Sequence, residues 1–208
     1  KWLGRLPGGL AMSSVAGCAG FSAVCGDSLA TAVTMGTVAL PGMRKHKYDM
    51  SLATGCLAAG GTMGILIPPS VGFIFDAIVT EESIGKLFMG GILPGLLLCS
   101  IFIVYIFFRT LMNRDLAPPV QEKYTFKEKV IVLRGVFLPI LLIFLVLGVI
   151  YGGVCTPTEA SAVGAFGAIV CALVYGKLTW ENLKTALWDT MKLNAMVFWI
   201  IIGALAFS

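Results

Sequence analysis

The chain has 208 residues, of which 58% are hydrophobic and only 12% are charged, and its mean hydropathy is +0.92. Because a soluble domain carries about 25% charged residues, this composition predicts an integral membrane protein and argues against a soluble fold. The net charge of +4 lies mainly in loops, which indicates membrane topology and not nucleic-acid binding.

The first apolar segment is rich in glycine, alanine and serine and is interrupted near its middle by residues 26–28. Each half has about 16 residues, which rise about 24 Å as a helix, and basic residues flank both ends. We therefore predict a re-entrant helical hairpin over 8–41. Asp27 or Ser28 can simply cap the second half-helix, although an intramembrane carboxylate is also expected next to a cation, a partner or water.

The next span, 50–79, contains the strongest interruption of the chain. Three glycines, a threonine and two prolines fall between Gly60 and Ser70. Proline has no N–H and pushes the preceding residue out of the α region, so several carbonyls lose their partners. Such groups at membrane depth line wet cavities in transporters, and they are hard oxygen ligands for a cation, as is the Thr62 hydroxyl. A packing kink is the alternative.

The remaining elements follow from hydropathy and charge. They are apolar spans over 84–108, 130–151 and 159–176, a basic connector over 109–129, an amphipathic helix over 177–192 and an apolar segment over 193–208. Thr156 and Glu159 have the spacing of a capping box, with Pro157 at the first helical position. The basic loops fall on one side of the membrane in this order, so the positive-inside rule makes them cytoplasmic.

The six cysteines form no CxxC pair, and His46 has no second ligand nearby in the sequence, so we expect no transition-metal site. Asp76 is expected near the membrane boundary with its carboxylate reaching water. The chain begins without methionine and ends inside an apolar run. We therefore expect it to be a piece of a longer protein.

Several of these segments closely resemble the large membrane subunit of tripartite ATP-independent periplasmic (TRAP) transporters, and together they cover nearly the whole chain. They are residues 14–23, Gly26, Ser28, 30–31, 35–36, 52–55, 60–70, 84–88 and 156–160. Asp27 departs from the family pattern, which often has serine at this position. An additional carboxylate there could strengthen a cation site or weaken the binding of an anion.

The resemblance implies an all-α, polytopic, inverted-repeat transporter of the elevator type, with a re-entrant hairpin and a broken transmembrane helix. Residues 1–108 would be part of the transport domain of the first repeat, and residues 109–129 a cytoplasmic connector. Residues 130–208 would begin the second repeat and end in a truncated hairpin or helix.

The implied function is that of a multi-pass permease subunit in the bacterial inner membrane. Sodium entry would drive uptake of a C4-dicarboxylate or another organic acid, which a periplasmic binding protein delivers. The implied partners are that protein, a small membrane subunit, the bilayer and the substrate. No nucleic acid is expected as a partner, and no cofactor besides the coupling sodium ions.

The resemblance also implies site residues at the tip and the break. The implied sodium ligands are Gly26, Ser28, Thr31, Gly60, Gly61, Thr62, Gly64 and Pro68. The implied substrate-binding residues are Asp27, Ser28, Thr62, Pro69 and Ser70.

Three other functions remain open from the residues alone. A divalent-anion/sodium symporter has similar hairpins and broken helices but needs no binding protein. A structural scaffold subunit would not need two backbone breaks at membrane depth. An intramembrane enzyme could use Asp27, Asp76 or Glu159 as acid or base, but no activated nucleophile accompanies them, so we expect that the chain is not an enzyme.

Overall fold

The computed structural model describes residues 7–118 and 126–206, and within these residues it contains helices and no strand. It divides into two compact units, Lys1–Ser161 and Ala162–Ser208. The predicted basic and aromatic edge at residues 1–5 lies outside the described residues. The all-α prediction is confirmed for the described part of the chain.

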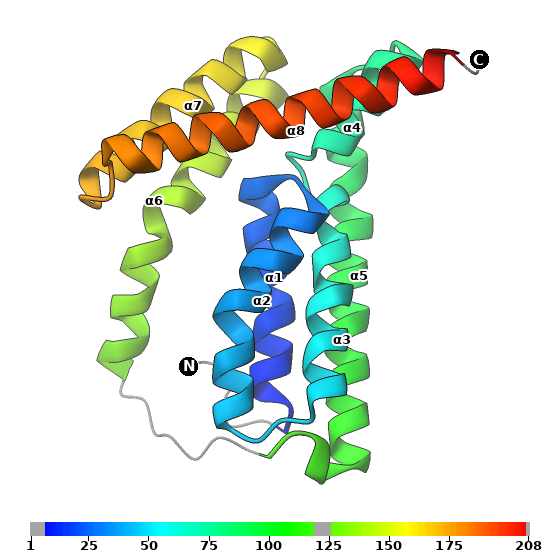
Figure 1. The fold of residues 1–208 in the computed structure, drawn as a ribbon, viewed down its shortest axis with the longest axis vertical. Coiled ribbons are helices and arrows are strands. Elements are labelled where there is room, and N and C mark those ends of the chain that lie inside the picture. Colours follow the sequence, from blue (N-terminus) through cyan, green and yellow to red (C-terminus); the bar gives the residue numbers. More distant parts are fainter. Residues whose placement is uncertain (1–6, 119–125, 207–208) are drawn as a thin grey trace. The chain divides into compact units, whose positions relative to one another are not determined.

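The first unit begins with two antiparallel helices, α1 (Gly9–Cys25) and α2 (Ser28–Lys45), shown in blue in Figure 1. The chain reverses at Gly26, whose φ of 66° is left-handed and whose N–H donates to the Ser22 carbonyl at 2.8 Å. Glycine adopts such a φ without steric cost. The expected helical hairpin is therefore present with its tip at 26–28, although its second helix continues through Pro41 to Lys45.

The expected break in the next span is also present. Helix α3 (Met50–Gly61) tightens into the 3-10 helix η1 (Thr62–Ile65), and α4 (Val71–Thr80) begins only after a non-helical segment. The Pro68–Pro69 peptide bond within that segment is cis. Because neither proline has an N–H, the carbonyls of Gly64 and Ile65 lose the partners that a continuous helix would supply.

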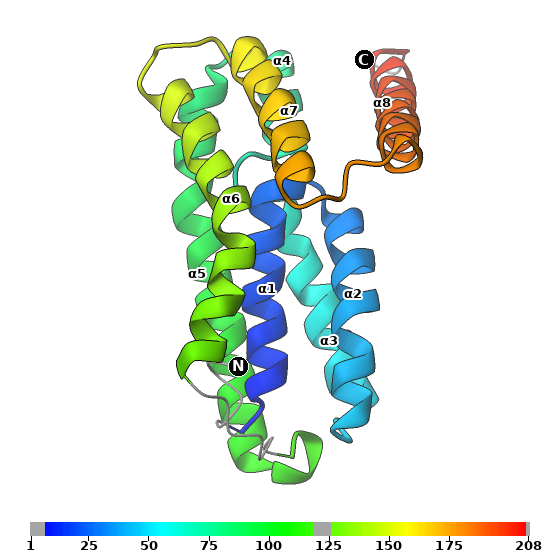
Figure 2. The same cartoon turned by 90° about the vertical axis from the view of Figure 1, so that its left-hand side faces the viewer.

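The long helix α5 (Ile84–Met112) returns along the bundle, and the 3-10 helix η2 (Arg114–Leu116) follows it. Figures 1 and 2 show that α1 and α3 run in one direction, and α2 and α5 in the opposite one. A hydrophobic core joins α1, α3 and α5. It includes Met12, Val15, Cys18, Ala53, Cys56, Leu57 and Ile106. The hairpin thus packs directly on the broken helix.

The connector region contains the start of α6 (Phe126–Tyr151), which begins before the predicted span at 130. Residues 119–125 of the predicted connector lie outside the described residues. Helix α7 (Pro157–Val174) begins with the predicted capping box: the Thr156 N–H donates to Glu159 Oε2 at 2.8 Å, and the Glu159 N–H donates to Thr156 Oγ1 at 3.4 Å. The proline at the first helical position and the reciprocal bonds confirm that prediction.

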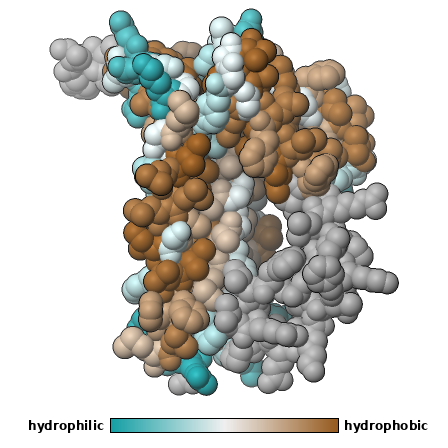
Figure 3. Space-filling view, turned by 180° about the vertical axis from the view of Figure 1, so that it is seen from behind, coloured by the Kyte–Doolittle hydropathy of each residue, from teal (hydrophilic) through white to brown (hydrophobic). Residues whose placement is uncertain are grey.

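Three helices in the described part of the chain are long and apolar enough to cross a membrane: Ile84–Met112, Pro157–Val174 and Trp180–Gly203. The outward side of α5 carries large exposed hydrophobic residues, namely Leu93, Leu96, Leu97, Ile101 and Val104. Figure 3 shows hydrophobic side chains along most of the height of the α5 side, with hydrophilic ones at both ends. These features are those of a helix in contact with lipid.

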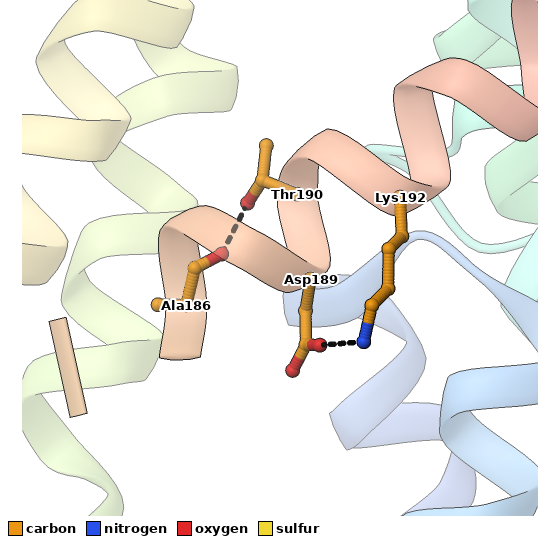
Figure 4. A network of polar contacts seen from close by, with 4 residues as sticks. All are labelled: Ala186, Asp189, Thr190 and Lys192. Carbon is orange, nitrogen blue, oxygen red and sulfur yellow. Dashed lines mark hydrogen bonds and ion pairs between the residues drawn. The ribbon is translucent and has the colours of Figure 1, made fainter. Parts of the chain in front are cut away.

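In the second unit, α8 (Trp180–Ala206) is one uninterrupted helix. The sequence predicted an amphipathic helix over 177–192 and a separate apolar segment over 193–208, whereas the structure has a single helix across both. Its first half carries polar contacts: Lys192 Nζ lies 3.5 Å from Asp189 Oδ1, and the Thr190 hydroxyl donates to the Ala186 carbonyl at 2.7 Å (Figure 4). The change from amphipathic to apolar sequence therefore occurs without a break in the backbone.

Candidate functional site at the hairpin tip

The hairpin tip lies directly against the break in the neighbouring helix. The Val71 N–H, at the start of α4, donates a hydrogen bond of 3.1 Å to the Gly26 carbonyl. A Cβ atom on Gly26 would lie 2.6 Å from the Pro69 carbonyl oxygen. Since real side chains do not approach backbone atoms so closely, glycine is required at the tip by both its φ and its contact.

Glycines on the other helix allow the same close approach. A Cβ on Gly64 would lie 2.5 Å from the Asp27 carbonyl oxygen, and a Cβ on Gly61 would lie 3.2 Å from the Ser28 carbonyl oxygen. A Cβ on Gly60 would lie 2.7 Å from the Cys18 sulfur in α1. Gly61 and Gly64 thus let backbone pack on backbone where the two interruptions meet, and Gly60 makes room for the Cys18 side chain of α1.

Two side chains hold the tip in shape. One Asp27 carboxylate oxygen accepts the Ala30 N–H at 2.7 Å, which makes Asp27 the N-cap of α2, as one of the two predictions for this residue required. The fully buried Thr31 hydroxyl donates to the Asp27 carbonyl at 2.7 Å. No hydrogen bond from the Ser28 hydroxyl is found within the described residues, so its oxygen is available to a ligand.

The break is held by a buried serine. Ser70, which is only 1% exposed, donates from its hydroxyl to the Ile65 carbonyl at 2.8 Å. This bond satisfies one of the carbonyls that the proline pair leaves without a helical partner. Pro68 is buried beside it, and Pro69 is half-buried.

Thr62 is placed differently from the other predicted site residues. It is exposed, and its hydroxyl donates to the Ala59 carbonyl of its own helix at 2.7 Å. The structure therefore brings the tip residues 26–28 against Gly61, Gly64 and 69–70, whereas the Thr62 side chain remains on the exposed side of η1. A hydroxyl group that donates a hydrogen bond still has oxygen lone pairs that can bind a cation.

Sequence reasoning did not select Ser22, which the structure places one turn before the tip. Its hydroxyl is fully buried and has no hydrogen-bond partner within residues 7–118 and 126–206. The only sequence signal was its helical spacing from Ser14 and Cys18, two other buried residues of α1.

Of the other acidic residues considered above, Asp76 is exposed on α4, and Glu159 belongs to the capping box. A cavity of about 420 Å³ lies elsewhere in the first unit, between α1, α3 and α5. Its lining includes Asp49, Arg109, Phe102 and Ile106. None of the predicted site residues is among those that line this cavity.

The described part of the chain is all helical, with membrane-length helices and a helix broken against a hairpin tip, and these features define an integral membrane protein of the helical class. The whole chain, residues 1–208, matches the family described as "Tripartite ATP-independent periplasmic transporter, DctM component". The chain therefore belongs to this family, as the resemblance in the sequence implied.

Individual relatives agree with this assignment. The C4-dicarboxylate TRAP transporter large permease protein DctM of Pseudomonas aeruginosa is 37% identical over 99% of this chain and 48% of its own length. The ectoine/5-hydroxyectoine TRAP transporter large permease protein UehC of Ruegeria pomeroyi is 34% identical over 100% of this chain and 48% of its own length. The sialic acid TRAP transporter large permease protein SiaM of Vibrio cholerae is 32% identical over 99% of this chain and 48% of its own length.

The chain spans about half the length of these curated relatives. Their names describe permease proteins and not enzymes, in agreement with the prediction that this chain is not an enzyme. The substrates in those names differ, so the family alone does not select one.

Proposed function

We propose that the full-length protein is the large permease subunit of a sodium-coupled secondary transporter that takes up an organic acid. A periplasmic binding protein would deliver the substrate, and a small membrane subunit would support the permease in the bacterial inner membrane. Membership in the TRAP transporter family and the permease names of its relatives support this proposal.

The observation that carries the proposal is the contact between the Gly26 tip and the break at 62–70. Two interrupted helices meet there through glycines, so carbonyl groups of each element lie against the backbone of the other. Alkali cations prefer hard oxygen ligands, and broken helices in transporters supply them from carbonyls. The Ser28 hydroxyl and the Gly64 carbonyl would complete a sodium site with Gly26, Thr31, Gly60 and Gly61.

The substrate side of the same contact would use helix N-termini. Helices α2 and α4 both begin at the contact, at Ser28 and Val71, and the N-terminus of a helix attracts anions through its free amides and its dipole. A carboxylate of the substrate would bind between them, near Pro69 and Ser70. The Asp27 carboxylate already caps α2, and its charge would favour the cation over the anion at this end of the site.

The topology follows from the same arrangement. Helices α1 and α2 would form a re-entrant hairpin with both outer ends in the cytoplasm, and the broken helix would cross to the acidic loop at 81–82. A second, inverted repeat in the remaining half of the protein would supply a second tip and break. An elevator movement of this transport domain would then carry ion and substrate across the membrane.

The test uses the full-length permease with its small subunit in proteoliposomes, the binding protein loaded with substrate, and an imposed sodium gradient. We expect uptake to require both the gradient and the binding protein. Ser28→Ala should raise the sodium concentration for half-maximal uptake about tenfold, or about 1.4 kcal/mol. Ser100→Ala, at an exposed serine that bonds only to Leu96 within α5, should leave it unchanged.

Two results would overturn the proposal. Uptake that is independent of sodium would remove the coupling ion, and uptake of free substrate without the binding protein would favour the divalent-anion symporter. If Ser28→Ala and Ser100→Ala had the same sodium dependence, the ligand assignment at the tip would be wrong.

A further inference from the structure

The hydroxyl of Ser22 is the only buried side-chain oxygen without a hydrogen-bond partner in the described part of the chain. A serine within a helix can donate to the carbonyl of the preceding turn, as Ser14 does to Leu10 at 2.9 Å on the same helix. Ser22 makes no such bond, although its side chain is 0% exposed. A buried hydroxyl without a partner destabilises a fold, so this one requires an explanation.

The position of Ser22 supplies that explanation. It lies one helical turn beyond Cys18, and Cys18 contacts Gly60 on α3. Helices α1 and α3 run in the same direction (Figure 1), and η1, which continues α3 and contains Gly64, also packs against α1. Gly64 is the glycine that packs on the Asp27 carbonyl, and its own carbonyl loses its helical partner to Pro68.

The carbonyls of the tip and those released by the break are oxygen acceptors, which attract a cation and repel an anion. The Ser22 hydroxyl adds a neutral oxygen one helical turn before that tip. The same residue also holds the tip through its backbone, since the Ser22 carbonyl accepts the Gly26 N–H.

We propose that Ser22 is a further ligand of the sodium ion held between the hairpin tip and the helix break. This inference rests on the proposed function, because it assigns one more residue to the same ion. It differs from the residues implied by the family resemblance, all of which lie at the tip or in the break. The Ser22 oxygen would approach the ion from the first helix of the hairpin.

The test measures ion binding without transport. The full-length permease with its small subunit is purified in sodium-free buffer, and its thermal unfolding is followed while sodium replaces choline at constant ionic strength. A ligand that binds the folded state raises the unfolding temperature. We expect Ser22→Ala to raise the sodium concentration for half-maximal stabilisation about tenfold, which is about 1.4 kcal/mol.

Two further variants separate ligation from folding. Ser14→Ala removes a serine of the same helix whose hydroxyl is bonded within that helix, so its sodium dependence should equal that of the wild type. Ser22→Cys keeps the size of the side chain but replaces the hard oxygen with sulfur. It should therefore shift the sodium dependence as Ser22→Ala does, and it serves as the readout if the alanine variant does not fold.

The outcomes distinguish the two proposals. If sodium does not stabilise the wild-type protein at all, the proposed sodium coupling fails. If sodium stabilises the wild type while the Ser22 variants titrate like Ser14→Ala, the sodium site stands but Ser22 is not a ligand. A tenfold shift confined to the Ser22 variants supports the inference.

Discussion

The carbonyl of Gly26 caps α4 by accepting the N–H of Val71 across 3.1 Å. The first amides of a helix have no partner within that helix, and α4 has no side-chain cap. The tip of the hairpin therefore supplies from another element the acceptor that a capping side chain usually provides. Since both groups belong to the backbone, the start of α4 is coupled to the position of the tip.

The close contact between Gly64 and the tip predicts a large effect of a single methyl group. Gly64→Ala would place a Cβ 2.5 Å from the backbone of Asp27. Backbone atoms cannot move aside as a side chain does, so we expect a loss of about 1–3 kcal/mol in the free energy of unfolding. Thermal unfolding of the purified full-length complex measures it.

The matched control for that variant is Gly55→Ala in α3, because nothing lies within 4 Å of a Cβ there. Alanine in a helix interior is favoured over glycine by about 0.5–1 kcal/mol, so this variant should be neutral or slightly stabilising. Equal destabilisation by both variants would contradict the packing described here.

A second glycine contact joins the break to α5. A Cβ on Gly91 would collide with the Phe73 ring and would lie 2.8 Å from the Leu66 carbonyl oxygen, whereas nothing lies within 4 Å of a Cβ on its neighbour Gly90. We expect Gly91→Ala to lower the unfolding temperature and to reduce sodium-dependent uptake, because it displaces the non-helical segment. Gly90→Ala should resemble the wild type in both measurements, and a loss of uptake in that variant instead would refute the assignment.

The loop between α2 and α3 is tied to the hairpin by a buried tyrosine. The Tyr48 hydroxyl accepts the Leu10 N–H at 3.2 Å, and the side chain is 4% exposed. Tyr48→Phe should lower the free energy of unfolding by about 0.5–1.5 kcal/mol near pH 8, because the Leu10 amide loses its acceptor. Chemical unfolding of the wild type and the variant measures this difference. Tyr105→Phe, at an exposed tyrosine, is the control.

The same tyrosine predicts a pH dependence. Burial raises the pKa of the Tyr48 phenol, whereas the phenol of the unfolded chain ionises near pH 10. Its contribution to stability is therefore complete below about pH 10 and is lost as the pH rises through the folded-state pKa. The stability difference between wild type and Tyr48→Phe should shrink above pH 10. A difference that is constant or grows from pH 8 to pH 11 would contradict this prediction.

The proposed re-entrant topology predicts which side of the membrane each loop faces. Three variants, Pro7→Cys, His46→Cys and Glu82→Cys, each add one cysteine that can be labelled with an impermeant maleimide in vesicles of known orientation. Labelling of the six native cysteines in the wild-type protein is measured separately and subtracted. We expect cytoplasmic labelling at Pro7 and His46, and periplasmic labelling at Glu82. Labelling of Pro7 and His46 from opposite sides would mean that the segment 8–41 crosses the membrane and is not re-entrant.

The positions of the hairpin tip and of the break were predictable because both depend on local backbone chemistry. Glycine at 26 permits the turn, Asp27 caps the next helix, and Pro68 and Pro69 cannot continue a helix wherever the rest of the chain lies. The capping box at Thr156 and Glu159 was predictable for the same reason. The sodium and substrate roles of the site residues remain predictions.

Where polarity changes without a backbone signal, the sequence was less informative. Residues 192–193 separate an amphipathic pattern from an apolar one, yet α8 continues through them. A helix ends when its hydrogen bonds lose partners, and a change of environment along its surface does not cause that loss. Helix α2 likewise continues through Pro41, although proline removes one intrahelical hydrogen bond there, so this proline did not mark the end of the helix.

The sequence by itself determined that this is a helical membrane protein and where its backbone is interrupted, because hydropathy, proline and glycine act within a few residues of their own position. Only the tertiary structure decided that Gly26 meets Pro69, that Gly64 meets Asp27, that Thr62 is exposed and that the Ser22 hydroxyl is buried without a partner. These relationships join segments tens of residues apart. They depend on how helices pack, which local preferences do not specify.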